Sequence, residues 1–235
     1  MDDEELPFSV KPEEKVDARK VMELLRSTYE GTELDVTRNI KIVNRKGDTI
    51  VSPIANPWMG STDIATYNMI APETVEAMRT VSVSWCSYSF VTQLRSWMPD
   101  EIGGICWFSV ENPGQSPRIP IFTGSTKLPS CFDECGHYNY NEESLLWRYR
   151  KANKLAQIQW GSTKKTMIDN VLRYEEKAMK EIPALEEEVK ALLEEGKKEE
   201  AQKLLNRYTS DFEAATANTW KEMEQSFWER FWVNF

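Results

Sequence analysis

The sequence predicts an α+β fold in which an antiparallel sheet is covered by C-terminal helices. Two observations support this prediction. Short apolar runs and most of the Pro and Gly residues precede Asn141, whereas long helical patterns rich in Glu, Lys, Ala and Leu follow it. Strands followed by helices, rather than strands alternating with helices, are typical of α+β domains. We therefore expect a sheet-rich part over residues 1–140 and a helical part of the same domain over residues 141–235.

The first elements are a helix and a hairpin. Asp17 is a good N-cap residue for a helix whose end is predicted at Gly31, since glycine is common just after a helix. Residues 39–52 read as two short strands around a turn that contains a glycine. A loop with two prolines follows, and Pro72 predicts a short helical turn over residues 73–78.

The strongest β pattern lies in the middle of the chain. Residues 79–88 and 89–97 alternate between apolar and polar side chains, which predicts strands with one apolar face. A short connection then leads into residues 105–110, so the strands should pair antiparallel, and the apolar face needs a cover such as the downstream helices. Residues 118–123 form a further strand. Pro120 within it and Pro117 just before it cannot donate to a ladder, so this strand should lie at an edge or a bulge.

The second part of the chain is helical. Residues 142–160 carry an apolar stripe at helical spacing. A second helix is predicted over residues 163–180, and Pro183 should begin a third. Gly196 is a natural place for one helix to turn into the next. The last segment, residues 220–235, is amphipathic and rich in aromatic side chains.

Composition excludes several classes of partner. The 235 residues carry a formal net charge of −9, which argues against nucleic-acid or anionic-membrane partners, because both require basic surfaces. No apolar run approaches the roughly 20 residues of a membrane span. The first ten residues are acidic and lack the features of a secretory signal, so cytoplasmic and secreted locations both stay open. Four cysteines in a chain of this length make no disulfide framework.

Few residues suggest catalysis. Cys131, Cys135 and His137 form a CxxxCxH cluster, but a closed zinc site needs four ligands, and the remaining thiols, Cys86 and Cys106, are distant in sequence. His137 is the only histidine, and no nucleophile motif or phosphate-binding glycine loop accompanies it. We therefore predict no catalytic residue, no metal site and no cofactor within this chain.

Substrate-binding candidates lie near the predicted sheet. Arg95 and Arg79 flank a serine-rich strand, and an arginine there could hold a substrate carboxylate through two hydrogen bonds. The alternative is a salt bridge to an acidic side chain. Asn56, Trp58 and Tyr88 could line the mouth of a pocket, with packing as the alternative for Trp58. We predict Asn56, Tyr88 and Arg95 as substrate-binding residues.

Longer motifs carry a family resemblance. The segments are YEGTELDVTR, SPIANPWM, SYSFVTQLRSWMPDEIGGICWFSV, NPGQSPRIPIFTGSTKLP and LLWRYRKANKLAQ. Together they resemble the later part of the dipeptidases of peptidase family C69, which are secernin-related N-terminal-nucleophile hydrolases. The resemblance spans nearly the whole chain and is most specific from Tyr29 to Trp160.

The resemblance implies a fold and a reaction. The fold is the four-layer αββα sandwich of N-terminal-nucleophile (Ntn) hydrolases, in which two stacked sheets lie between helical layers. The activity is hydrolysis of dipeptides by a cysteine at the mature N-terminus, without a metal. A free α-amine titrates near pH 8 and can serve as the base for the adjacent thiol. The thiolate attacks the peptide carbonyl, hydrogen-bond donors hold the oxyanion, and water resolves the thioester.

This chain departs from the family pattern at the nucleophile. It begins with Met1 rather than cysteine, and its four cysteines are internal and therefore have no free amine. We expect the C-terminal portion of a dipeptidase, encoded as a truncated or separate chain, which requires a missing N-terminal half or a complementary chain and is inactive alone. The expected ligand is a dipeptide, and a homo-oligomer is possible.

Two alternatives to the dipeptidase interpretation remain. The first is a non-catalytic binding module, because the predicted cleft is rich in aromatic side chains and lacks a nucleophile. The second is an interaction protein that uses residues 220–235 as a docking helix.

Overall fold

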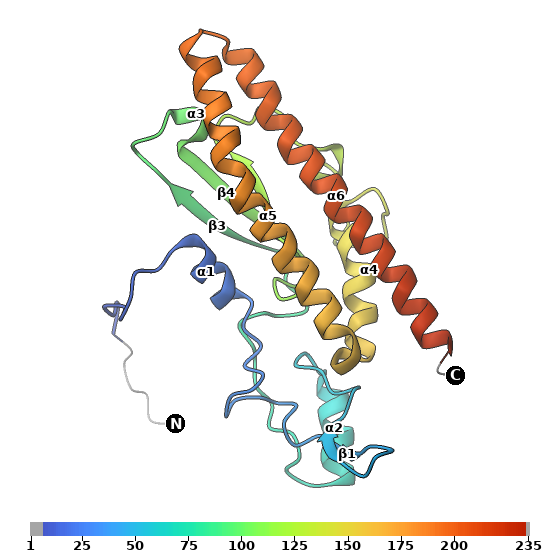
Figure 1. Cartoon of the computed structure of the whole chain (residues 1–235). Helices are drawn as coiled ribbons and strands as arrows, with labels where there is room; N and C mark the ends of the chain where they lie inside the picture. Colours follow the sequence, from blue (N-terminus) through green and yellow to red (C-terminus); the bar gives the residue numbers. More distant parts are fainter. Residues whose placement is uncertain (1–6, 234–235) are drawn as a thin grey trace.

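The computed structural model describes residues 7–233, and the expectation about Met1 lies outside them. The elements, in chain order, are α1 (Ala18–Leu25), β1 (Lys41–Val43), β2 (Thr49–Val51), α2 (Ser61–Ile70), β3 (Tyr88–Leu94), α3 (Asp100–Gly103), β4 (Gly104–Val110), β5 (Ile119–Phe122), η1 (Ser130–Phe132), α4 (Leu145–Ile158), α5 (Trp160–Glu194) and α6 (Lys198–Val233). The predicted α+β class is confirmed (Figure 1). Within the described range, no helix is both long and apolar enough to cross a membrane.

The main sheet has three antiparallel strands in the order β3-β4-β5. Trp107 of the central strand β4 pairs with Val91 of β3 and with Pro120 of β5. The predicted antiparallel pairing is confirmed, and so is the edge position of the proline-containing strand. Pro120 has no N–H group to donate, and an edge strand needs hydrogen bonds on one side only.

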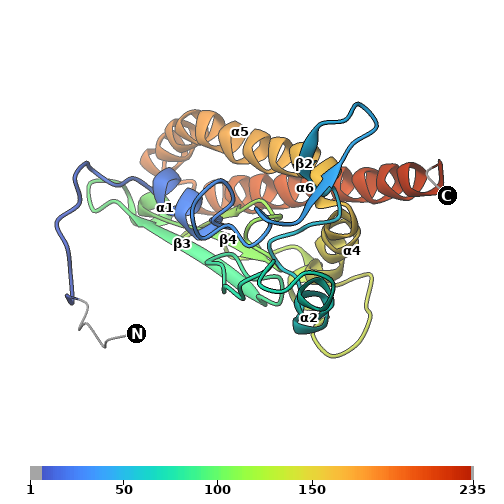
Figure 2. The ribbon, with the colours of Figure 1, turned by 90° about the horizontal axis from the view of Figure 1, so that it is seen from below.

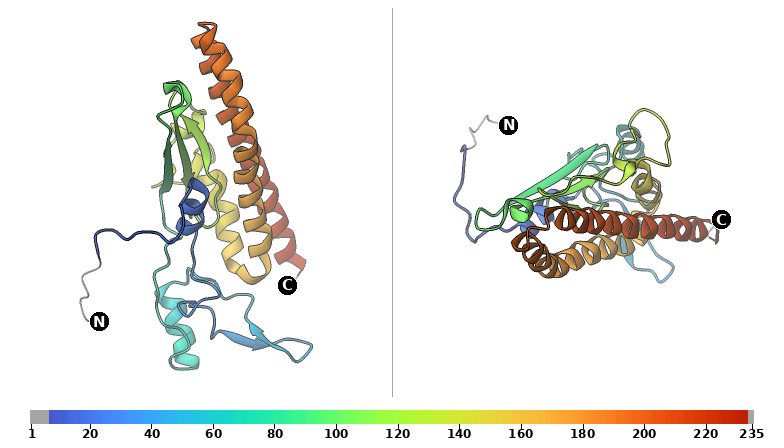
Figure 3. Two further views of the ribbon diagram at one scale, coloured as in Figure 1. Left: turned by 60° about the vertical axis from the view of Figure 1, so that its left-hand side comes forward. Right: turned by 90° about the horizontal axis from the view of Figure 1, so that it is seen from above.

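The long helices cover one face of this sheet. Figure 3 shows α4, α5 and α6 on the same side of the three strands. Val91, Ile105 and Trp107 of the sheet belong to the same buried apolar cluster as Met167 of α5 and Trp220 of α6. The hydrophobic core is therefore shared between the sheet-rich and the helical part of the chain.

The other face of the sheet is apolar and open. Tyr88, Phe90 and Leu94 on β3 are 57%, 53% and 74% exposed, and beyond the strand Trp97 is 77% exposed. The rings of Tyr88 and Phe90 stack with centroids 6.3 Å apart, and Tyr88 also stacks on Phe108 of β4. None of the long helices covers this face (Figure 3). The sheet is therefore sandwiched on one side only within residues 7–233.

Pro183 does not begin a helix, because α5 runs continuously through it. A proline inside a helix costs about 3 kcal/mol. Its neighbours Ile182 and Leu185 are buried in the core while Pro183 itself is exposed, so packing on both sides offsets the cost. Gly196, with a φ of +75°, does form the turn between α5 and α6, as predicted.

Three predictions in the first part were wrong. Helix α1 begins after Asp17 as expected but ends at Leu25. Gly31, where its end was predicted, lies in a separate turn. Residues 73–78 form no helical turn; instead α2 precedes Pro72. Residues 79–87 form no strand.

The alternation in residues 79–87 has a different cause. Ser82 and Ser84 are buried, whereas Val81 and Trp85 are 46% and 65% exposed. The amide of Ser82 donates to Ser27 in the loop after α1, so this segment binds a loop rather than a neighbouring strand. Alternating burial alone therefore did not produce a strand here.

The predicted hairpin is confirmed, with Ile42 of β1 opposite Ile50 of β2. The hairpin projects from the body of the molecule (Figure 2). A second, small apolar cluster, formed by Val36, Ile40, Ala55 and Val75, includes no residue of the two hairpin strands, which are exposed along their length.

Candidate functional site

The connection between β4 and β5, residues 111–118, is polar and yet fully buried. We call it the buried polar turn. Five of its side chains are 0% exposed: Glu111, Asn112, Gln115, Ser116 and Arg118. Loops normally run over the surface, and burying polar groups is costly unless they find partners. The buried polar side chains of this turn must therefore have specific hydrogen-bonding or ionic partners in the fold.

Local geometry explains the Asn-Pro-Gly sequence. Asn112 accepts a hydrogen bond from the amide of Gly114 at 3.0 Å and donates to Gln115 at 2.9 Å. A Cβ atom on Gly114 would lie 2.5 Å from the Ser82 hydroxyl, so any larger residue there would force the buried Ser82 or the turn to shift. Glu111 has a φ of +62°, a strained value for a residue other than glycine. The turn is thus held in one conformation by its own side chains.

Helix α4 neutralises the acidic end of the turn. Glu111 Oε2 accepts hydrogen bonds from the Asn112 amide at 2.6 Å and from Asn153 Nδ2 at 2.8 Å. Its other oxygen lies 3.5 Å from Lys154 Nζ and 3.7 Å from Arg150 Nε. The buried carboxylate therefore faces two cations from one helix, which satisfies its charge.

The basic end of the turn is arranged differently. Arg118 Nη1 lies 3.2 Å from Glu175 Oε1, and the Arg118 backbone amide donates to the same oxygen at 3.3 Å. The second oxygen of Glu175 accepts from Arg26 Nη2 at 2.5 Å. Burial lowers the pKa of Arg118, and the Glu175 carboxylate opposes this effect. One carboxylate thus serves two guanidinium groups.

Arg118 retains unused donors. Its Nε and Nη2 groups are buried and have no hydrogen-bond acceptor among residues 7–233. Buried polar groups are almost always paired, and an unpaired one requires an explanation such as a bound ion, water or ligand. These two buried N–H groups could therefore donate hydrogen bonds to an anion, which is the chemistry that the site supports best.

Segments distant in sequence complete the site at one end of the sheet. The amide of Glu111 donates to Ser87 O at 3.1 Å, and Lys154 Nζ donates to Ser84 O at 2.9 Å. Cys86, in the same segment, interacts electrostatically with both Glu111 and Arg118. The irregular segment 82–87 therefore passes over the buried polar turn, just before β3 begins.

The three predicted substrate-binding residues do not converge. Asn56 is half-buried and accepts a hydrogen bond from the amide of Trp58 at 2.9 Å. Tyr88 begins β3, whereas Arg95 follows its end, and seven residues of extended chain span about 24 Å. Arg95 Nη2 lies 2.6 Å from Glu186 Oε1, which is the salt-bridge alternative. Tyr88 pairs with Val110, next to the buried polar turn, whereas Arg95 lies beyond the opposite end of β3.

Arg118 was not among the sequence candidates. The sequence shows it only as the first residue of a proline-containing edge strand. The one available signal is a run of polar residues directly between two apolar strands. Whether such a run is exposed or buried depends on α4 and α5, which follow much later in the chain.

The cysteines lie in different environments. Cys131 is buried, and its burial, together with the nearby Glu213, raises the pKa of the thiol to about 12. Burial also raises the pKa of Cys86 and Cys106, whereas Cys135 is exposed. Over residues 7–233, no three His, Cys, Asp or Glu side chains are grouped closely enough to hold a metal ion.

Thiol alkylation should follow this order of environments. We expect Cys135 to react first with iodoacetamide at pH 8. Cys131 should react at least about 1,000-fold more slowly, because a pKa near 12 leaves so little thiolate. Peptide mass spectrometry of a labelling time course measures both rates. Equal labelling of Cys131 and Cys135 in the folded protein would contradict the buried position of Cys131.

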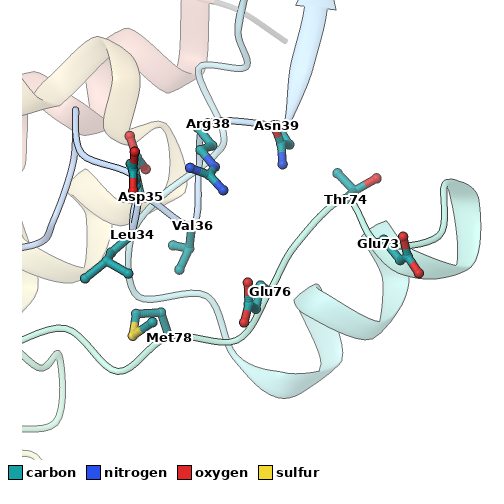
Figure 4. Close-up of a pocket in the computed structure, with 10 residues that line it drawn as sticks. Leu34, Asp35, Val36, Arg38, Asn39, Glu73, Thr74, Glu76 and Met78 are labelled. Carbon is teal, nitrogen blue, oxygen red and sulfur yellow. The ribbon is translucent and has the colours of Figure 1, made fainter. Parts of the chain in front are cut away.

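A separate pocket lies beside the small apolar cluster. It has a volume of about 190 Å³ and is lined by residues 33–39 on one side and by residues 73–78 on the other (Figure 4). Asp35 is already bound to the amide of Gly31 and to Thr37. This pocket contains no residue of the buried polar turn, so we do not assign it to the candidate site.

Comparisons with known proteins agree with the motifs. Residues 1–173 match the model of peptidase family C69. A "Probable dipeptidase" from Latilactobacillus sakei is 22% identical over 165 residues, which are 70% of this chain and 28% of that protein. The chain therefore spans less than a third of the length of this relative. The buried polar turn lies within the matched residues, and the match covers most of the chain, so the chain belongs to peptidase family C69.

Proposed function

We propose that this chain is the C-terminal portion of a C69-type dipeptidase. The complete enzyme would hydrolyse dipeptides through an N-terminal cysteine that lies outside this chain. Membership of family C69 and the name of the relative support a dipeptidase. The observation that carries the proposal is the open apolar face of the β3–β5 sheet next to the buried polar turn.

The open face has the properties of half a sandwich. Tyr88, Phe90 and Leu94 of β3 are each more than half exposed on this face, and contiguous exposed apolar surface typically marks an interaction site. In an Ntn-hydrolase sandwich, a second sheet packs against such a face at about 10 Å. We propose that polypeptide outside this chain supplies that second sheet. The relative is long enough to contain it, because the match covers only 28% of its length.

The cleft between the sheets would then end at the buried polar turn. The nucleophile would approach from the second sheet, with its α-amine as the base. This chain would contribute the rigid wall of the cleft, with Tyr88 on the open face and Arg118 behind segment 82–87. Its own cysteines are unsuited to the nucleophilic role, because they have no free amine and burial raises the pKa of Cys86, Cys106 and Cys131.

The isolated chain should not hydrolyse dipeptides. The expected rate equals the uncatalysed background, because the proposal places the nucleophilic thiol and its α-amine base outside this chain. Liquid chromatography of free amino acids released from a dipeptide panel measures this rate. The matched positive sample is a longer polypeptide read in frame from an upstream cysteine, which should be active. Turnover by the 235-residue chain that survives replacement of all four cysteines would refute the proposal.

A second candidate function is supported by the end of α6. Trp228 and Trp232 are 58% and 82% exposed, whereas Trp220, Phe227 and Phe231 on the same helix are buried. The exposed pair could dock a second copy of this chain. Sedimentation should then show concentration-dependent association that is lost when Trp228 and Trp232 are both replaced by Gln. Association that is unchanged by both replacements would exclude this role for α6.

A further inference from the structure

The cluster of Arg26, Glu175 and Arg118 carries an excess positive charge. The three side chains are 10%, 5% and 0% exposed, so water can do little to stabilise that charge. Each oxygen of Glu175 contacts one arginine, but the carboxylate carries a single negative charge, which cannot neutralise two guanidinium groups. A buried charge without a full counter-charge is strongly unfavourable. A second anion would balance the cluster.

The free donors of Arg118 have the geometry for one particular anion. Nε and Nη2, the two groups without an acceptor, lie on the same edge of the guanidinium. Their N–H bonds point in the same direction, and a carboxylate can accept both with its two oxygens. The opposite part of the group is already used, because Nη1 contacts Glu175. A single carboxylate therefore fits the remaining edge.

Solvent-accessible space lies against this cluster. One cavity of about 370 Å³ between α1 and α5 is lined by Arg26 and Glu175, among others. A second cavity of about 340 Å³ is lined by Arg26 and by Gly114 of the buried polar turn. Arg118 itself is enclosed, so a ligand must displace part of its cover. The irregular segment 82–87 is one neighbour of this arginine, because Cys86 interacts electrostatically with Arg118.

We propose that Arg118 binds a carboxylate through its Nε and Nη2 groups, and that this carboxylate is the free α-carboxylate of a dipeptide. The identity of the ligand rests on the proposed dipeptidase function. The carboxylate site does not, because it follows from the charges and donors of this chain. Arg118 thus takes the role that the sequence suggested for Arg95, whose guanidinium is bound to Glu186.

The test compares acetate with chloride as probes. Sodium acetate should raise the melting temperature of the 235-residue chain more than sodium chloride does at the same ionic strength. Arg118→Met should abolish this difference. Its fold should persist, because Glu175 keeps Arg26 as a partner and still accepts from the backbone amide of residue 118. Arg207→Met is the matched control on an exposed arginine and should respond to acetate like the wild type.

The dipeptide is tested against its own amide. Titration calorimetry with alanyl-alanine and with alanyl-alaninamide should give at least about tenfold tighter binding for the free acid, and Arg118→Met should lose this preference. If Arg118→Met does not fold, Arg118→Lys keeps the charge but loses the paired donors. It should fold and show a preference at least about threefold weaker than the wild type.

Two results would overturn the inference. Equal shifts of the wild-type melting temperature in acetate and in chloride would refute the proposed carboxylate site. An acetate effect combined with equal binding of the dipeptide and its amide would remove the substrate assignment, and the carboxylate would then come from an Asp or Glu of the remaining polypeptide. Neither result depends on hydrolysis, so failure here is distinct from failure of the proposed function.

Discussion

Glu175→Gln is expected to lower the free energy of unfolding by about 3–5 kcal/mol, the usual cost of removing one partner of a buried ion pair. Glutamine preserves the size of the side chain but removes its charge. Arg118, which is fully buried, and Arg26, which is 10% exposed, would then face each other without an anion. The same substitution should loosen the end of α1, because Arg26, which directly follows that helix, contacts Glu175 in α5.

Urea unfolding followed by tryptophan fluorescence measures this loss. Glu176→Gln is the matched control, since Glu176 is the exposed neighbour of Glu175 on the same helix, and its effect should stay within about 0.5 kcal/mol. A loss below about 1 kcal/mol for Glu175→Gln would contradict the assignment of Glu175 as the main counter-charge of both arginines.

Asn153→Asp is expected to cost at least about 3 kcal/mol, because it places a second carboxylate against the buried Glu111. Asn153 Nδ2 now donates to Glu111 Oε2 at 2.8 Å and to Ser116 Oγ at 2.9 Å, and its Oδ1 accepts from Trp220 Nε1 at 2.9 Å. An oxygen in place of the donor nitrogen would turn the hydrogen bond to Glu111 into repulsion. Glu111 and Asn153 are both fully buried, so water cannot screen it.

The variant should also acquire a characteristic pH dependence. Two carboxylates that share a buried site retain a proton, so a pKa of the pair rises above its value in the unfolded chain. Between that unfolded value, near 4, and the raised pKa, the folded protein binds more protons than the unfolded protein. Its stability must then fall as pH rises, and acid should partly rescue the variant.

Urea unfolding at a series of pH values from about 4 to 8 measures this dependence. Asn218→Asp is the matched control, because Asn218 donates to Glu222 at 2.8 Å on the exposed side of α6. Like charges at that spacing should cost only about 0.5 kcal/mol. If the unfolding free energy of Asn153→Asp varies with pH in parallel with that of the wild type, the new carboxylate does not lie close to Glu111.

Local patterns determined those parts of the fold that depend on neighbouring residues. The β4–β5 pairing, the edge position of Pro120 and the turn at Gly196 follow from which backbone groups can donate and which φ angles are accessible. The apolar stripe predicted over residues 142–160 likewise follows from helical spacing, and in α4 its Tyr149 and Ala152 are buried. The family could also be identified from the sequence, because its motifs are long and contiguous.

Tertiary packing decided the features that depend on distant segments. Pro183 stays inside α5 because Ile182 and Leu185, on either side of it, are buried in the core. Residues 79–87 form no strand because Ser82 binds the buried polar turn and a loop instead. Arg118 becomes a candidate binding residue because α5 places Glu175 beside it, 57 residues later in the chain. Whether an arginine side chain is exposed or buried depends on the distant segments that pack around it, and the spacing of apolar residues along the sequence does not predict that packing.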